Sequence, residues 1–165
     1  MEFLAKLHPE IIHFPIAFLL GYALFEILGI FLKNEFLSKA AHLLLFLGVL
    51  GMIAAVLTGN QAKDIAHKIS KTGISISFKA ISEHEDYANI TLWFFAALLV
   101  LRTMAVIKKR FSGLIKYLFI ILSLIGSFLV YETGEHGGSL VYKHGIGTEL
   151  RMMDNNPSDN VPGGK

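Results

Sequence analysis

Four long apolar runs dominate this chain and constrain what it can fold into. Each run is roughly 18 to 22 residues long, enough to cross the ~30 Å hydrocarbon core of a bilayer as a helix. Because a backbone in lipid must satisfy its own hydrogen bonds, runs of this kind are expected to be helical. The sequence therefore predicts an all-α membrane protein, a four-transmembrane-helix bundle formed by Ile11–Leu32, Ala40–Thr58, Ala88–Ile107 and Leu114–Tyr131.

The composition agrees with a bilayer environment. Of the 165 residues, 53% are hydrophobic and only 17% are charged, whereas soluble domains carry about a quarter charged residues. We expect the lipid bilayer as the main partner and no nucleic acid. The length allows one membrane domain over residues 1–150, followed by a flexible polar tail over 151–165. No small-residue cleavage pattern follows the first run, so we expect it to be retained as a span.

The charges predict an orientation. The two short connections between paired runs, with their flanking residues, hold seven basic side chains against Glu35 alone: Lys33, Lys39, Arg102, Lys108, Lys109, Arg110 and Lys116. Short loops rich in Lys and Arg stay in the cytoplasm. Since four spans return the chain to the side where it began, both termini are expected on the periplasmic side of a bacterial inner membrane.

A longer segment, Gly59–Tyr87, joins the second run to the third. Its first part predicts a continuation of the second helix to about Lys71. After that, Ile74, Ile76 and Phe78 alternate with polar residues, a period-two pattern that predicts a short strand-like strip.

Six of the seven histidines fall on the predicted periplasmic side, at one end of the bundle. Imidazole is the commonest metal ligand and is nearly neutral at pH 7, so the cluster points to a haem or metal site. The chain has no cysteine, which excludes thiolate–zinc sites, iron–sulfur clusters and covalent c-type haem attachment through its usual motif. The six are His8, His13, His67, His84, His136 and His144.

His13 and His84 form the favoured ligand pair. They stand near the N-terminal ends of the first and third runs, on the same side of the membrane, so both side chains are expected to point into the bundle. Two neutral imidazoles on facing helices are the ligand set of a b-type haem. The remaining periplasmic histidines could complete a second haem or an exposed metal site, and the sequence does not pair them. The competing interpretation is a solvated helix start with no cofactor.

The stretch His136-Gly137-Gly138 is unusual for a helix end in its glycine content. Glycine permits a close approach of the backbone to a ligand, which makes Gly137 and Gly138 candidate cofactor-binding residues. We expect this stretch to break the fourth helix, and Ser139–Gly147 to fold back over the bundle as an ordered loop.

Two ionisable residues lie inside the predicted spans near the cytoplasmic side, Glu26 and His42. An ionisable group in a membrane is a functional hypothesis by default. Paired together, these two could form a proton or quinone site, or they could simply neutralise one another. By contrast, the small residues Gly48, Gly51, Ala54 and Ala55 are interpreted as sites of close helix packing.

Three motifs together resemble a bacterial family of small four-helix membrane proteins of unknown function: LHPEIIHFPIAF, HEDYANI and GGSLVYKHGIG. The resemblance implies a four-span bundle in a respiratory or redox setting, sometimes beside cytochrome c domains, and no established reaction. The family's histidines correspond to His8, His13, His84 and His144, and its paired glycines to Gly137 and Gly138.

The favoured function is electron transfer by one or two b-type haems, between a quinone pool and a c-type cytochrome or within a larger redox complex. We expect an electron carrier or complex subunit rather than a stand-alone enzyme. One alternative is a non-haem membrane protein that binds or transports Cu or Zn, since imidazole suits both metals. Another is a structural subunit of a respiratory complex whose histidines serve as interface anchors.

Overall fold

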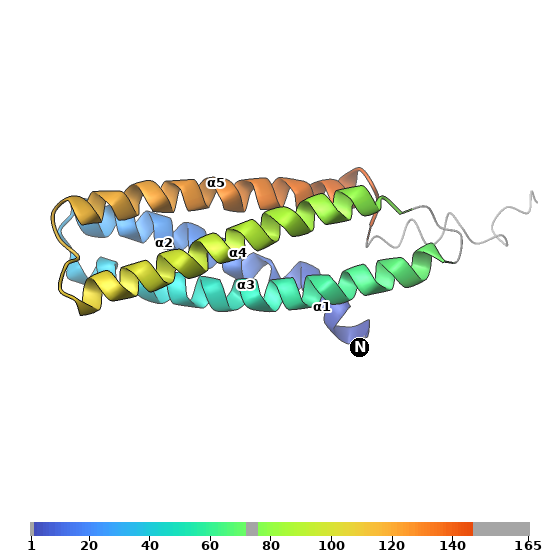
Figure 1. The fold of residues 1–165 in the computed structure, drawn as a ribbon, viewed down its shortest axis with the longest axis horizontal. Helices are drawn as coiled ribbons and strands as arrows, with labels where there is room; N and C mark the ends of the chain where they lie inside the picture. Colours follow the sequence, from blue (N-terminus) through green and yellow to red (C-terminus); the bar gives the residue numbers. More distant parts are fainter. Residues whose placement is uncertain (1, 72–75, 147–165) are drawn as a thin grey trace, which may run out of the picture.

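The computed structural model describes residues 2–71 and 76–146, and within them the chain is helical and contains no strand. The helices run nearly antiparallel in one elongated bundle (Figure 1). Four stretches are long and apolar enough to cross a membrane, which confirms the predicted number of spans. The helices are α1 (Glu2–Ile11), α2 (His13–Phe31), α3 (Glu35–Ser70), α4 (Phe78–Ile107) and α5 (Leu114–Tyr142).

The bundle is built from two hairpins. Helix α2 packs along α3, and α4 packs along α5; the hairpins then meet through α3 against α4 and α2 against α5. We call the end with the short turns 32–34 and 108–113 the basic end, and the opposite end the histidine end. The core between the hairpins includes Leu19, Tyr22, Leu45, Phe95 and Phe119.

Glycines bring α2 and α3 close together. A Cβ atom at Gly29 would lie 2.9 Å from the backbone nitrogen of Ser38, and one at Gly48 would lie 2.4 Å from Leu19 Cδ2. A Cβ at Gly51 would meet the ring of Pro15 at 3.2 Å. Small residues permit such contact between membrane helices, so the packing role predicted for Gly48 and Gly51 is confirmed.

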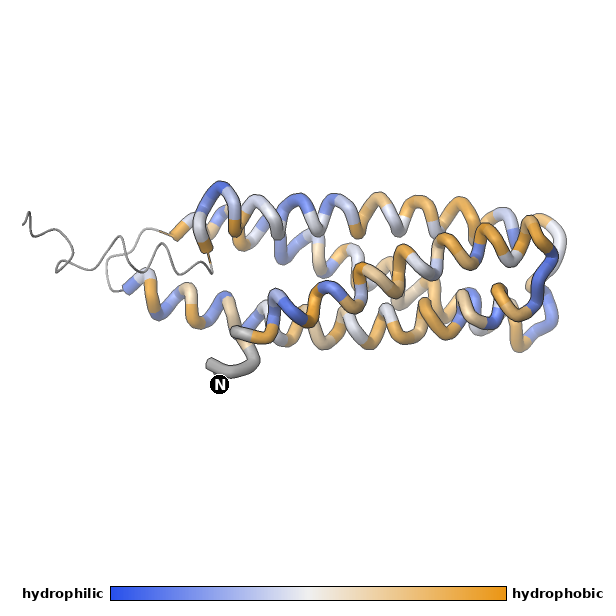
Figure 2. The backbone as a smooth tube through the Cα atoms, turned by 180° about the vertical axis from the view of Figure 1, so that it is seen from behind, coloured by the Kyte–Doolittle hydropathy of each residue, from blue (hydrophilic) through white to orange (hydrophobic). Residues whose placement is uncertain are grey.

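Helices α3, α4 and α5 all continue beyond the apolar runs, and all at the histidine end. The extensions 59–70, 78–87 and 132–142 each add about 15 to 18 Å at 1.5 Å per residue. Figure 2 shows more hydrophilic segments at this end of the tube than in the apolar middle of the bundle. The bundle therefore carries a polar helical extension that contains three of the seven histidines, His67, His84 and His136.

The structure confirms one prediction for the long connecting segment and corrects another. Helix α3 does continue to Ser70. The predicted strand is wrong at Phe78, which begins α4, and Ile76 lies outside any regular element; Ile74 lies outside the described residues. A period-two pattern over so few residues does not distinguish a strand from the start of a packed helix.

The predicted break at His136-Gly137-Gly138 is also wrong. Helix α5 passes through these residues and ends at Tyr142, so Ser139 to Tyr142 is helical rather than part of a loop. Glycine weakens a helix by only about 1 kcal/mol, which packing against α4 can offset. Residues 147–165, including the predicted tail, lie outside the described part of the chain.

The first span is bent rather than continuous. Pro9 lies inside α1, which begins at Glu2. A turn at Ile12 separates α1 from α2, and Figure 1 shows the chain changing direction there. Helix α1 packs chiefly on α3 rather than on α2, which directs His8 at α3.

Candidate functional site

His8 is held by α3 through a hydrogen bond whose direction can be assigned. Its Nδ1 lies 3.0 Å from Thr58 Oγ1, and that hydroxyl lies 3.0 Å from the carbonyl oxygens of both Ala54 and Ala55. A carbonyl only accepts, and the hydroxyl has a single proton, so Thr58 donates to its own helix. His8 Nδ1–H therefore donates to Thr58, and the lone pair lies on Nε2.

His84 is held by α5 in a comparable way. Its Nδ1 lies 3.2 Å from the backbone carbonyl oxygen of Thr133, so the ring donates through Nδ1–H and keeps its lone pair on Nε2. The Thr133 hydroxyl lies 2.9 Å from that of Thr91, which fixes α4 against α5 close to the imidazole. Both rings thus donate a hydrogen bond from Nδ1–H to a neighbouring helix.

Each of these two rings lies against a glycine of the helix that holds it. A Cβ at Gly59 would lie 3.1 Å from His8 Cε1, and a Cβ at Gly137 would lie 3.0 Å from His84 Cε1. A side chain at either position would push on the ring, because few real Cβ contacts are so short. Gly59 and Gly137 therefore provide the space that the imidazoles occupy.

The two rings belong to the same region of the histidine end. His84 lies within electrostatic range of both His8 and His136. His136 donates through Nδ1 to the carbonyl of Glu132 at 2.8 Å and stacks on Tyr87 with ring centroids 4.2 Å apart. Two different hairpins thus contribute imidazoles to one region.

A cavity of about 180 Å³ lies beside this region, between the start of α4 and the end of α5. His144 Nδ1 lies 3.2 Å from the carbonyl oxygen of Ser139 on one wall, and Lys79 pairs with Glu83 at 3.8 Å on the other. The lining residues are Ser77, Lys79, Ala80, Glu83, His136, Ser139 and His144.

The structure places two predicted site residues elsewhere. His13 is the first residue of α2 and is exposed, so the expectation that it points into the bundle is wrong; the turn at Ile12 gives the inward position to His8 instead. His67 is exposed and stacks on Phe78 with centroids 4.3 Å apart. Of the paired glycines, Gly137 contacts His84, whereas a Cβ at Gly138 would meet only Tyr142, at 4.0 Å.

Sequence reasoning missed the residues that hold the rings, Thr58, Gly59 and Thr133. A Thr-Gly step does end the second apolar run, at Thr58-Gly59, and another follows the fourth, at Thr133-Gly134. The Thr58-Gly59 step was a usable signal, since threonine can bond within its own helix while glycine opens its surface. Near Thr133 the glycine that contacts the ring is Gly137, not Gly134.

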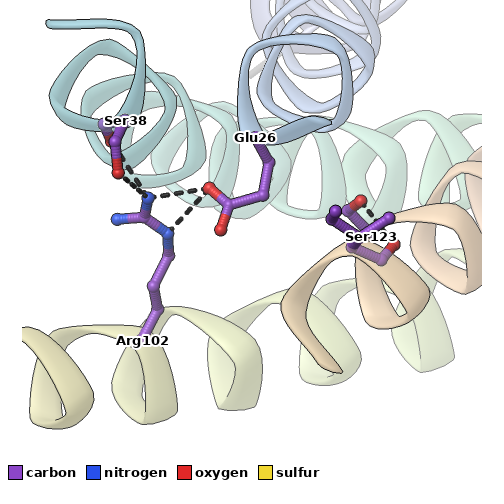
Figure 3. A network of polar contacts seen from close by, with 5 residues as sticks. Glu26, Ser38, Arg102 and Ser123 are labelled. Atoms are coloured by element: carbon purple, nitrogen blue, oxygen red, sulfur yellow. Dashed lines mark hydrogen bonds and ion pairs between the residues drawn. The ribbon is translucent and has the colours of Figure 1, made fainter. Parts of the chain in front are cut away.

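The ionisable pair near the basic end is also different from the one predicted. Glu26 pairs with Arg102, not with His42: Arg102 donates to Glu26 Oε2 from Nε at 3.1 Å and from a terminal nitrogen at 2.7 Å (Figure 3). Arg102 also donates to the carbonyl of Ser38 at 2.9 Å and lies 4.7 Å from the ring centroid of Phe111. Both side chains of the pair are almost completely buried, at 0% and 1% exposure.

Comparison with known proteins identifies the family of the chain. A family model described as predicted membrane protein (DUF2231) matches residues 5–150. The chain belongs to the DUF2231 family. No curated protein and no solved structure matches it. The match covers the whole of the described bundle except its first residues, and it agrees with the resemblance to an uncharacterised membrane family.

The described residues can be compared with the ligand sets that zinc and haem iron require. Over residues 2–71 and 76–146, no three side chains of His, Cys, Asp or Glu converge as a metal-binding group. Zinc sites in proteins use three or four protein ligands, whereas haem iron needs only two axial ligands beyond its macrocycle. What the described residues do supply is two imidazoles, from different helices.

Proposed function

We propose that this DUF2231 protein is a membrane b-type cytochrome-like electron carrier whose haem is ligated by His8 and His84. The observation that supports this most is the matched setting of the two rings: each donates Nδ1–H to a neighbouring helix and keeps its Nε2 lone pair. Metal-ligating histidines commonly bind in this way, with the second nitrogen bonded to a protein acceptor that orients the ring.

The surrounding residues would orient the two ligands. Gly59 and Gly137 keep side chains away from the two imidazoles, and the Thr58 hydroxyl and Thr133 carbonyl hold the rings in place. Bound haem would supply one-electron chemistry. The protein's own residues would orient the ligands and fix the spacing between the two hairpins that carry them.

The charge distribution supports a periplasmic location for the site. The basic end keeps Lys33, Lys39, Lys108, Lys109 and Arg110 even though Arg102 is neutralised by Glu26. We infer that this end is cytoplasmic, by the preference of short basic loops for that side, and that both termini are periplasmic.

The position of the site along the bundle indicates its partner. About 20 residues cover ~30 Å of hydrocarbon, so a boundary at the basic end places the opposite boundary near Leu57, Ala88 and Gly134. His8, bonded to Thr58, and His84 then lie at or just outside the membrane surface. A site at this depth is accessible from water and suits a soluble c-type cytochrome or a larger redox complex as partner.

The test is a reduced-minus-oxidised visible spectrum of protein purified after haem-replete expression. We expect the α-band of a b-type haem in the wild type, and its loss in His8→Ala and in His84→Ala. The exposed His13→Ala and His67→Ala variants are matched controls and should keep the band. A wild-type protein without the band contradicts the proposed function. Loss of the band in His13→Ala but not in His8→Ala would contradict only the choice of ligand.

A further inference from the structure

A second candidate binding region lies far from the histidine end. A groove of about 430 Å³ runs between α3 and α4 near the basic end. Its walls are almost entirely apolar, and its two polar side chains are His42 and Thr103. The lining residues are His42, Phe46, Leu99, Val100, Thr103 and Met104.

His42 lines the groove with an imidazole whose two nitrogens differ in their surroundings. Its Nδ1 is enclosed and has no hydrogen-bond partner among the described residues. A neutral imidazole carries one N–H, and an enclosed N–H without an acceptor is rarer in proteins than an under-satisfied acceptor. The proton is therefore assigned to Nε2, the nitrogen that is not enclosed. Thr103 donates its own proton to the Leu99 carbonyl at 2.7 Å, so its oxygen can only accept from a ligand.

The depth of the groove in the membrane restricts which molecules can accept a hydrogen bond from His42 Nε2. His42 is seven residues into α3, roughly 10 Å from the start of that helix at 1.5 Å per residue. The polar parts of phospholipids lie outside the hydrocarbon core, so they do not reach this depth. An acceptor here must belong to a molecule whose polar ring enters the hydrocarbon.

We propose that the groove binds the ring of an isoprenoid quinone, one of whose carbonyls accepts a hydrogen bond from His42 Nε2. The apolar walls formed by Phe46, Val100 and Met104 suit the ring and the start of its hydrocarbon chain. In the reduced form, a ring hydroxyl can instead donate to Thr103 Oγ1. The site is independent of the proposed haem, since along α4 Thr103 lies about 28 Å from His84 at 1.5 Å per residue.

Photolabelling tests this assignment. The full-length protein in lipid nanodiscs is irradiated with a photoreactive azidoquinone, and the adducts are located by peptide mass spectrometry. We expect adducts on the α3 and α4 segments that contain Phe46 and Leu99–Met104, and competition by excess unlabelled quinone. Loss of the single hydrogen bond in His42→Ala should lower labelling on the order of tenfold, the effect of about 1.4 kcal/mol.

Three further variants sharpen the result. His42→Gln keeps an N–H donor and should retain part of the labelling, whereas Val100→Trp fills the groove without altering His42 and should abolish it. His67→Ala, on the same helix at the other end, should label as the wild type does. Undiminished labelling in both His42→Ala and Val100→Trp would overturn the proposal. So would a photoreactive acyl-chain phospholipid that labels the groove and is not displaced by quinone.

Discussion

At the scale of single residues, the two inward imidazoles depend on what their neighbours lack. His8 and His84 lie flush with α3 and α5 because Gly59 and Gly137 carry no side chain. The same helices provide the acceptors that set the ring tautomers, the Thr58 hydroxyl and the Thr133 carbonyl. The position and the tautomer of each ring are therefore determined by two residues of one neighbouring helix.

Gly134 and Gly137 of α5 should respond differently to substitution by alanine. A Cβ at Gly134 meets nothing within 4 Å, whereas one at Gly137 would press on His84. Gly134→Ala should raise the free energy of unfolding by about 0.5 to 1 kcal/mol, the usual gain in a helix. Gly137→Ala should give no gain or a loss. Denaturant unfolding in detergent measures both, and equal gains would show that Gly137 does not confine the ring.

Thr58 should act as a positioning residue for the proposed haem ligand. Thr58→Val removes the acceptor of His8 Nδ1–H at nearly constant volume, and loss of such a partner lowers metal affinity by about 10- to 100-fold. Thr58→Ser keeps the hydroxyl and should restore binding. Haem titration followed by visible spectroscopy checks this, and identical affinities for the Val and Ser variants would contradict it.

At the scale of helices, the basic end is tied together by one buried cation. Arg102 on α4 reaches Glu26 on α2 and Ser38 on α3 (Figure 3), so three helices meet at one guanidinium. Ionised groups in a membrane are costly unless paired. This pair therefore specifies how the α2–α3 hairpin docks on α4. The glycine contacts, by contrast, hold α2 and α3 together within the hairpin.

Removing one partner of this pair should cost far more than removing both. Arg102→Met leaves the Glu26 carboxylate buried without its partner, and breaking a buried pair in this way costs about 3 to 5 kcal/mol. The double variant Glu26→Gln, Arg102→Met should be substantially more stable than Arg102→Met alone. A double-mutant cycle of unfolding free energies measures the coupling. Additive effects at the two positions would indicate that the pair is not coupled.

The α2–α3 hairpin should be sensitive to Gly29 in particular. A Cβ at this position meets the backbone of Ser38, which cannot rotate away as a side chain can, so Gly29→Ala should separate the helices and destabilise the protein by about 1 to 3 kcal/mol. Gly21→Ala is the control, because its Cβ would only touch Leu44 at an ordinary 3.4 Å. Thermal unfolding distinguishes them, and indistinguishable melting temperatures would argue against close backbone contact.

At the scale of the whole molecule, hydropathy was enough to predict four spans, since length and apolar content alone decide whether a run can cross a bilayer. The continuation of α3 to about Lys71 was predicted, but the start of α4 and the end of α5 were not, because these polar extensions are stabilised by neighbouring helices rather than by lipid. Nor could it show that His8 replaces His13 as the inward ring, which follows from the turn at Ile12. The partner of Glu26 depends on a contact across 76 residues, which no local pattern records.

The orientation of the whole bundle can be tested directly, since the chain contains no cysteine. Single replacements Lys71→Cys at the histidine end and Ser112→Cys at the basic end each introduce a unique thiol. A membrane-impermeant maleimide should label the first in intact cells and the second only after the membrane is opened. The reverse pattern would invert the proposed topology and place the histidine end in the cytoplasm.

The separate docking of α1 has a consequence for biogenesis. His8 lies near the beginning of the chain, but the helix that receives it, α3, is made later, and the Thr133 and Gly137 that support His84 come almost last. During synthesis the two halves of the site therefore cannot coexist until the final helix has been inserted. If the site holds a coloured cofactor, only a fully inserted chain can bind it. The absorbance of the cofactor then measures the amount of fully inserted protein in the membrane.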